Sequence, residues 1–288
     1  MAPPPSALYS LSFVIALLAT IIVAATLRLL AILPYRHPQT TPWRKRPIAT
    51  RILIVLGSGG HTHEMFYLLK DLDTRKYTHR TYVVSSGDAF SAQRAADFEA
   101  QLEQREKQRA KERQQPVPDI TITKATAHAP PHKRAQSRTL DQERPACTGP
   151  KHYTIATIPR ARRIHQPLLT TPLSCLRTLL SAFTILLPPS IPATDPYTAA
   201  SLDCPDLIIT NGPATAVVLV LAAFLLRFFD VRGAHSRGKC KAIYVESFAR
   251  VRTLSLSGKM LCWVVDRFLV QWEALADGRR AEYHGILV

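Results

Sequence analysis

The sequence has 288 residues, of which 47% are hydrophobic, and it carries a formal net charge of +16. This length suits one or two domains, and the charge predicts an anionic partner: phosphate groups, nucleic acid or an acidic membrane surface. The five cysteines are widely spaced, odd in number and without a C-x-x-C pair. That pattern argues against a disulfide framework or a zinc site and favours reduced thiols in the cytosol.

Residues 8–27, LYSLSFVIALLATIIVAATL, form an uncharged apolar run long enough to span a bilayer as a helix. We expect a membrane anchor over residues 1–33, with its helix at about 8–30, and a basic, proline-containing linker at 34–50. A cleaved signal peptide is the alternative, but it would carry basic residues before a shorter apolar run. Here the basic residues follow the run, with no acidic residue among them: Arg28, Arg36, Arg44, Lys45, Arg46 and Arg51. The positive-inside rule then places the N-terminus across the membrane and the rest of the chain in the cytosol.

From residue 51 onward, apolar runs that suit buried parallel strands alternate with helical patterns. We expect six strands, at residues 52–56, 81–84, 152–158, 206–210, 242–245 and 268–271. Helical spacing of apolar residues predicts helices at 65–72, 169–187, 214–229 and 259–265. This order predicts one Rossmann-like α/β domain over residues 51–288, built on a doubly wound parallel sheet.

Residues 100–151 break the alternation. The segment begins as a charged, glutamine-rich run and then becomes rich in proline, histidine, serine and threonine. Such a composition buries too little apolar surface to fold alone, so we expect a disordered insertion with at most a fraying helix at its start. Acidic residues are mixed among its bases, which suits a solvated helix face better than nucleic-acid binding: Glu99, Glu103, Glu106 and Glu112. We therefore expect no nucleic-acid partner.

A glycine loop, Gly57-Ser58-Gly59-Gly60, directly follows the first predicted strand and precedes a predicted helix. Backbone N–H groups of such a loop bind phosphate or pyrophosphate, and we expect Gly59 and Gly60 to let them approach it. A tight turn without a ligand is the alternative. The dinucleotide fingerprint is incomplete, because Thr62 stands where its last glycine belongs, and no Walker Gly-Lys-Ser/Thr follows.

Two further polar loops follow predicted strands, Asn211-Gly212-Pro213 and Glu246-Ser247. Ligands of open parallel sheets lie beyond the carboxyl ends of the strands, so we expect these loops and the glycine loop to converge on one crevice. Glu246 is open to two interpretations: a carboxylate whose pKa is tuned by burial, or a structural acceptor for backbone N–H groups.

Two apparent metal motifs are discounted. His61, His63 and Glu64 lie within one turn and have no evident fourth ligand, so we expect no metal there. The D-x-D motif at 71–73 follows the first helix, far from the carboxyl ends of the strands.

The combined motifs GSGGHT (57–62), TNGP (210–213), YVES-FARV (244–251) and VQW (270–272) resemble a known family. It is the membrane-anchoring subunit of the eukaryotic UDP-N-acetylglucosamine transferase, which makes the second sugar transfer of dolichol-linked oligosaccharide synthesis. The resemblance covers most of residues 51–288 outside the insertion. The chain is also similar to the N-terminal half of the bacterial transferase that adds N-acetylglucosamine to the lipid-linked peptidoglycan precursor, which His61, Gly212, Pro213 and Glu246 match.

The resemblance implies the acceptor half of a two-domain GT-B glycosyltransferase. Its donor half would be a separate soluble catalytic chain that binds UDP-N-acetylglucosamine, and the anchored chain would be inactive without it. The implied reaction is inverting, β-1,4, and needs no cofactor, since the nucleotide sugar is a substrate. The implied location is the endoplasmic reticulum membrane and the contiguous nuclear envelope, where the preceding N-acetylglucosamine-1-phosphate transferase is a candidate neighbour.

Site residues follow from the motifs and their matches. We expect Glu246 or His61 to act as general base. Acceptor pyrophosphate and sugar are expected to contact Gly57, Ser58, Gly59, Gly60, Thr62, Asn211, Gly212, Pro213 and Ser247. The apolar C-terminal residues Ile286, Leu287 and Val288 are expected to pack against the donor-binding chain, with docking on their own domain as the alternative.

Two other function classes remain open at this point. A membrane-tethered nicotinamide-dependent reductase would share the fold, although the incomplete fingerprint and the lack of a Tyr-x-x-x-Lys pair disfavour it. A non-catalytic membrane recruiter would explain every feature except the polar residues of the crevice. The leucine-rich helix near 169–187, flanked by arginines, either lies on the anionic leaflet or packs internally.

Overall fold

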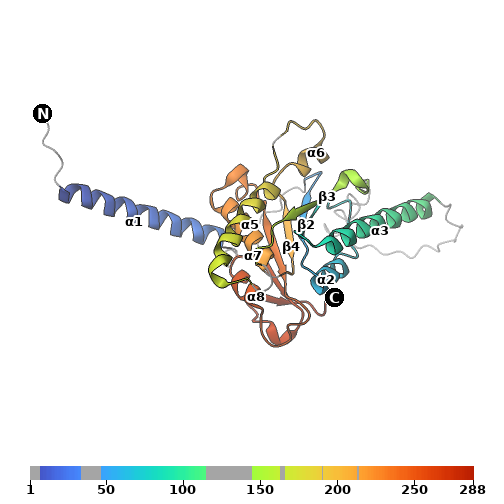
Figure 1. Cartoon of the computed structure of the whole chain (residues 1–288). Coiled ribbons are helices and arrows are strands. Elements are labelled where there is room, and N and C mark those ends of the chain that lie inside the picture. Colours follow the sequence, from blue (N-terminus) through green and yellow to red (C-terminus); the bar gives the residue numbers. More distant parts are fainter. Residues whose placement is uncertain (1–6, 34–46, 115–144, 163–165, 190, 213) are drawn as a thin grey trace, which may run out of the picture.

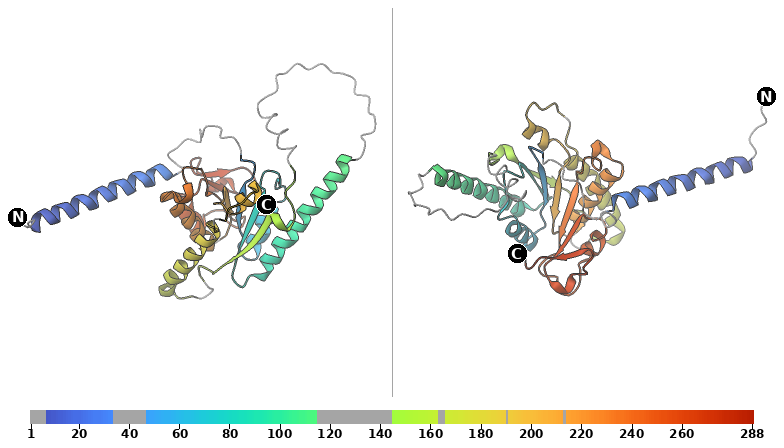
Figure 2. Two further views of the ribbon diagram at one scale, coloured as in Figure 1. Left: turned by 90° about the horizontal axis from the view of Figure 1, so that it is seen from above. Right: turned by 180° about the vertical axis from the view of Figure 1, so that it is seen from behind.

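The computed structural model describes residues 7–33, 47–114, 145–162, 166–189, 191–212 and 214–288. A long helix projects from an α/β domain, so its first turns lie far from the sheet, whereas the C-terminus lies beside helix α2 (Figure 1). Figure 2 shows the same arrangement from two other directions.

The projecting helix is α1 (Ala7–Ile32), close to the expected anchor helix. It is long and apolar enough to cross a membrane, and the rest of the protein does not cover its most apolar stretch. Its last turns do contact the domain. The Arg28 guanidinium donates hydrogen bonds to the carbonyl oxygens of Phe228 (2.8 Å) and Arg227 (2.9 Å), and Ile32 is buried. Helix α1 thus contacts the domain through side chains as well as being joined to it by the chain.

The sheet has seven parallel strands in the order β3-β2-β1-β4-β5-β6-β7. The strands are β1 (Arg51–Val55), β2 (His79–Ser85), β3 (Tyr153–Ile158), β4 (Leu207–Thr210), β5 (Lys241–Val245), β6 (Arg267–Val270) and β7 (Ala281–Tyr283). The predicted doubly wound α/β fold is confirmed, and the first six strands lie close to their expected positions. Strand β7 was not expected from the sequence.

Helices cover both faces of the sheet (Figures 1 and 2). They are α2 (Gly60–Leu68), α3 (Ala89–Gln114), α5 (Thr171–Leu186), α6 (Pro196–Ser201), α7 (Ala214–Phe228) and α8 (Leu256–Leu261). Short 3-10 turns are η2 (Pro150–His152), η3 (Leu168–Thr170), η4 (Val231–Gly233) and η5 (Glu273–Leu275). Strand β1 shows why its sequence is continuously apolar: Ile52 and Ile54 pack under α2 and α3, whereas Leu53 and Val55 pack under α5, α7 and α8.

The expected disordered insertion at 100–151 is wrong at both of its ends. Residues 100–114 continue helix α3, because Phe98 and Leu102 are buried against the sheet and hold the charged helix in place. At the other end Cys147 is buried and η2 leads into β3. The central part of the expected insertion, residues 115–144, and most of the expected linker lie outside the described residues.

Glu99 also departs from expectation. It was expected on a solvated helix face, but it is only 2% exposed. Its carboxylate accepts two hydrogen bonds from the Arg80 guanidinium (2.6 and 2.8 Å) and one from the Tyr82 hydroxyl (2.7 Å). Burial and the neighbouring Glu99 charge raise the pKa of Tyr82 well above its usual value. The ion pair between Arg80 and Glu99 joins β2 to α3 inside the domain.

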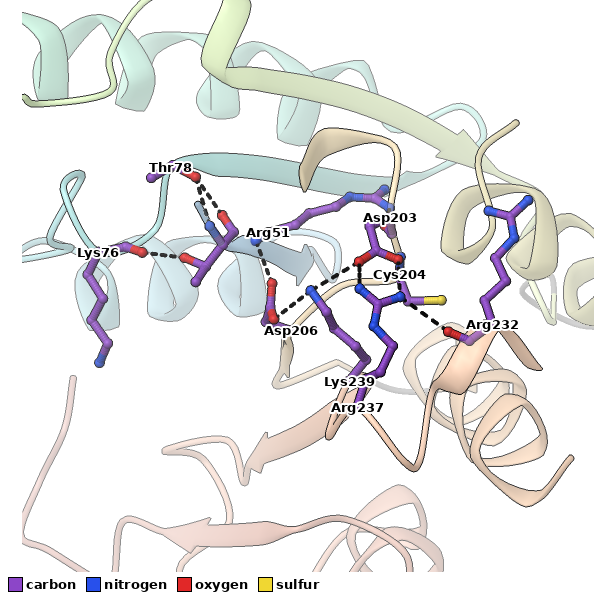
Figure 3. A network of polar contacts seen from close by, with 10 residues as sticks. Arg51, Lys76, Thr78, Asp203, Cys204, Asp206, Arg232, Arg237 and Lys239 are labelled. Carbon is purple, nitrogen blue, oxygen red and sulfur yellow. Dashed lines mark hydrogen bonds and ion pairs between the residues drawn. The ribbon is translucent and has the colours of Figure 1, made fainter. Parts of the chain in front are cut away.

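A second ionic cluster lies at the amino ends of β1, β4 and β5 (Figure 3). Asp206 accepts a hydrogen bond from the Arg51 backbone N–H (2.9 Å), and Lys239 pairs with Asp206 (2.7 Å) and Asp203 (3.3 Å). Arg51 is buried, and this burial lowers the pKa of its guanidinium to about 10. Arg51 is therefore a structural residue at the amino ends of the strands rather than a surface charge beside helix α1.

Candidate functional site

The crevice of this fold lies at the carboxyl ends of β1 and β4. These strands are neighbours, yet the chain leaves β1 toward β2 on one side and leaves β4 toward β5 on the other. In open α/β sheets ligands bind where the strand order reverses in this way. The glycine loop follows β1, Asn211-Gly212 follows β4 and Glu246-Ser247 follows β5, so the structure brings the three expected loops to one edge.

Gly57 and Gly212 allow two of these loops to touch. A Cβ atom on Gly57 would lie 2.6 Å from the Cβ atom of His61 and 3.5 Å from the Cα atom of Gly212. The first distance is shorter than non-bonded Cβ contacts in real structures, so a side chain at Gly57 would clash with His61, whereas the second is an ordinary van der Waals distance. Gly57 is therefore required by the turn into α2, and the loops that follow β1 and β4 are in van der Waals contact at Gly57 and Gly212.

Gly59 and Gly60 form the start of helix α2 and have different roles. Gly59 has φ 61°, in the left-handed region that favours glycine, whereas Gly60 has an ordinary φ. A Cβ atom on either residue would meet nothing within 4 Å. Ser58, Gly59 and Gly60 are exposed, and no side chain caps the helix. The backbone N–H groups at this helix N-terminus can donate hydrogen bonds to an anion.

Thr62, expected to contact the acceptor, points into the protein instead. It is 1% exposed, and its hydroxyl contacts the carbonyl oxygen of Gly57 and lies 2.8 Å from the hydroxyl of Ser91. Ser91 in turn donates to the same carbonyl (3.2 Å) from the first turn of α3. Thr62 therefore fixes the glycine loop to α3 rather than facing the crevice.

The Glu64 carboxylate, which the sequence suggested only as part of an apparent metal motif, connects the three loops. Glu64, on the first turns of α2, accepts a hydrogen bond from the Ser247 hydroxyl (2.9 Å) and a longer one from Asn211 Nδ2 (3.4 Å). Asn211 Nδ2 also donates to the carbonyl oxygen of His61 (2.7 Å). His61 Nδ1 lies 3.8 Å from Glu64 Oε2. The spacing of three residues between His61 and Glu64 places both on one helix face.

Glu246 adopts the structural role, the second interpretation given above. Its side chain is 1% exposed, and its Oε2 accepts from the backbone N–H and the hydroxyl of Ser255, each at 3.1 Å. A Cβ atom on Gly258 would lie 2.1 Å from the same oxygen, so glycine is required there. Ser255 also caps α8 by accepting from Gly258 N (2.9 Å). Burial, with Glu246 as a secondary cause, raises the pKa of the neighbouring Tyr244 to about 12.

The C-terminal tail lies beside the crevice. Ile286 is 58% exposed, whereas Leu287 and Val288 are half-buried. Val288 forms one wall of a narrow cleft that is also lined by Glu64, Met65, Leu68, Asn211, Val245 and Gln271. Val288 thus docks on its own domain, and Ile286 is the most exposed of the three residues. Pro213 lies outside the described residues.

Within the described part of the chain, no three His, Cys, Asp or Glu side chains group in a way that could hold an ion.

The leucine-rich region around α5 exposes apolar side chains. Four of its apolar side chains are exposed although α5 packs on α7: Leu169, Leu173, Leu176 and Leu180. All five cysteines are free thiols.

Comparison with known proteins identifies a family. A family model described as "Oligosaccharide biosynthesis protein Alg14 like" matches residues 52–129 and 113–287. The UDP-N-acetylglucosamine transferase subunit alg14 of Aspergillus fumigatus is 36% identical over 258 residues, covering 78% of this chain and 100% of the relative. The corresponding subunit of Schizosaccharomyces pombe is 33% identical, covering 85% and 86%, and that of Homo sapiens is 30% identical, covering 78% and 77%. No solved structure matches the chain.

Proposed function

This chain belongs to the Alg14 family of oligosaccharide biosynthesis proteins, and from that membership we propose that it is the acceptor-binding, membrane-anchoring subunit of a two-chain UDP-N-acetylglucosamine transferase. The reaction is the addition of the second N-acetylglucosamine to dolichol-linked N-acetylglucosamine pyrophosphate. One observation carries the proposal: the exposed, uncapped N-terminus of α2 at the switch point of a domain attached to an apolar helix.

A partner chain is part of this proposal. The relatives are named as subunits of a transferase, and the described domain supplies one Rossmann-like sheet. In the proposed complex this domain holds the lipid pyrophosphate, and a soluble catalytic chain brings UDP-N-acetylglucosamine. The assembled enzyme acts at the endoplasmic reticulum membrane, with this domain on the cytosolic side.

The proposed chemistry is a single displacement with inversion. The 4-hydroxyl of the acceptor sugar attacks the anomeric carbon of the donor, the new C–O bond forms, and UDP leaves with the electron pair of the broken bond. A general base takes the hydroxyl proton. Of the two expected bases, His61 is half-buried at the crevice, whereas the Glu246 carboxylate is held by Ser255. We therefore assign the proposed base to His61.

Two features support attachment to the membrane. Helix α1 can span a bilayer by its length and composition, and the exposed leucines of the α5 region lie on the layer that contains α7, to which α1 is bonded. An apolar helix face beside a spanning helix is suited to lie at the bilayer surface.

Protease added to sealed microsomes should digest the chain from residue 47 onward and leave the segment before Arg28 protected. The reason is that the nearby basic residues, from Arg28 onward, all follow the apolar run at 8–27, which favours a cytosolic domain. Fragments are followed with tags at both termini, and detergent should expose the remaining segment. Protection of the whole domain in sealed vesicles would contradict the orientation.

The exposed tail residue provides a test of partner docking. Ile286→Asp should weaken copurification of the donor-binding chain by about 10- to 100-fold, because burying an isoleucine contributes about 1.5–3 kcal/mol. Copurification is measured from detergent-solubilised membranes. Phe90→Asp is the matched control, since Phe90 is also 58% exposed but lies on α3. Full recovery of the partner with the Ile286 variant would show that the tail is not the joint.

A further inference from the structure

Two buried amide oxygens at the crevice lack a hydrogen-bond donor within the described chain, Asn211 Oδ1 and Gln271 Oε1. The side chains of Asn211 and Gln271 are 3% and 1% exposed. Their orientations are fixed, because Asn211 Nδ2 donates to the His61 carbonyl (2.7 Å) and Gln271 Nε2 donates to the Glu246 carbonyl (3.1 Å). A buried acceptor left unpaired costs about 1–3 kcal/mol, which points to a donor supplied from outside the chain.

Both amides line the same narrow cleft as Glu64, which in this structure has no room for a water-sized sphere. Glu64 keeps unused acceptor capacity: a carboxylate offers about four lone-pair sites, and here Ser247 and, at longer range, Asn211 supply one donor each. Apolar side chains form the other walls, namely Met65, Leu68, Val245 and Val288. The side chains of the cleft therefore present hydrogen-bond acceptors set among apolar surfaces.

This lining selects a ligand class. An anion would be repelled by Glu64, and the amide nitrogens of Asn211 and Gln271 already donate to other groups, whereas hydroxyl and amide N–H groups find three acceptors. Apolar walls suit the C–H faces of a sugar ring. The neighbouring α2 N-terminus has the opposite character, because it offers N–H donors to an anion. The crevice thus has an anion-binding end and a donor-accepting end, joined at Asn211.

We propose that this cleft is the subsite for the terminal sugar of the acceptor, with Glu64 as the residue that reads its hydroxyl or acetamido N–H groups. The inference rests on the function proposed above. In the acceptor the sugar is bonded directly to the pyrophosphate, so adjacent sites of opposite character match adjacent parts of one ligand. Glu64 is a specificity residue here, and the proton still goes to His61.

The cleft can widen to admit a ring because of what forms its outer wall. A sugar ring enters only if Val288 moves outward, and Val288 is only half-buried. Gly285, with φ 86°, precedes the last three residues. Displacing the tail therefore leaves the sheet and α2 in place, whereas Glu64, Asn211 and Gln271 lie on rigid elements or directly after strands.

The test combines a variant with altered acceptors. The complete two-chain enzyme, wild type or Glu64→Gln, is assayed with isoprenyl pyrophosphoryl N-acetylglucosamine. It is then assayed with three analogues: 3-deoxy, 6-deoxy, and one with a hydroxyl in place of the acetamido group. We expect the wild type to lose at least about tenfold in kcat/KM with one analogue. With the full acceptor, the kcat/KM of Glu64→Gln should be lower than that of the wild type by about the same factor. Changing the acceptor to that analogue should lower the kcat/KM of the variant little further, since the contact between Glu64 and the missing group is already lost.

Several outcomes overturn the proposal. One is a wild type indifferent to all three analogues, as expected if no sugar enters the cleft. Another is independence of the two effects, in which every analogue lowers the kcat/KM of Glu64→Gln by the same factor as it lowers that of the wild type. Sugar-free isoprenyl pyrophosphate serves as a competitor, and its inhibition should be equal in the two enzymes; weaker inhibition of the variant would mean that Glu64 supports the whole crevice. Glu273→Gln, an exposed carboxylate beyond β6, is the matched control. A wild-type complex inactive on the full acceptor would refute the proposed function itself.

Discussion

Transfer by the assembled enzyme should fall at least about 100-fold when Gly60 is replaced by valine, while membrane attachment and partner binding persist. A side chain at Gly60 costs the fold little, because its φ is ordinary and an added Cβ atom meets nothing within 4 Å. That open space lies over the uncapped N-terminus of α2, where the pyrophosphate is proposed to bind. The isopropyl group would occupy it and keep the pyrophosphate from N–H donors, contacts that are worth about 100-fold or more in comparable sites.

Gly60→Ala should give a smaller loss in the same direction, and Ala110→Val, on the exposed part of α3, should give none. Activity is measured as sugar transferred to a lipid pyrophosphate acceptor, with copurification of the partner measured in parallel. Near-normal transfer by the valine variant would leave the chain a membrane recruiter without a ligand of its own. The variant therefore separates an acceptor-binding subunit from a recruiter.

Glu99→Ala should destabilise the domain by about 3–5 kcal/mol, because it leaves the Arg80 guanidinium buried without its carboxylate. In the native state burial opposes the charge of Arg80, while the bonds and charge of Glu99 raise its pKa, so the arginine stays charged. For a domain of this size the loss corresponds to a decrease of about 10 °C in Tm.

The measurement is thermal unfolding of the detergent-solubilised protein. Glu103→Ala is the control on the same helix: its exposed pair with Lys107 should contribute less than about 1 kcal/mol. Equal melting temperatures for the Glu99 variant and the wild type would show that the buried pair contributes nothing measurable to stability.

The sheet was predictable because most of its strands are apolar on both faces, a pattern that few other structures produce. Strand β7 was not predicted because it is only three residues long and one of them, Glu282, is charged. Glu282 pairs with Arg267 on the neighbouring strand β6. Helix α3 escaped for another reason. A few apolar side chains, among them Phe98 and Leu102, hold it to the sheet, and its composition is otherwise that of a solvated segment.

The location of the crevice was also predictable, since loops after parallel strands must share one edge. The roles of its two carboxylates were not. Glu246 stands directly after a strand, but the direction of its side chain depends on Ser255 and Gly258 in a later helix. Glu64 acquires its contacts from Asn211 and Ser247, which are far away in the sequence. Such contacts depend on tertiary packing and leave no local pattern.

The bond between α1 and α7 restricts how the enzyme can move. Arg28 holds one end of α7, and the crevice begins at the other end of this 15-residue helix, about 22 Å away. In the proposed membrane orientation, the two hydrogen bonds of Arg28 oppose tilting of the domain relative to α1. The crevice of the proposed enzyme would then stay at one height above the bilayer, and its encounters with a lipid-borne acceptor would depend on the number of acceptor molecules per unit of membrane area.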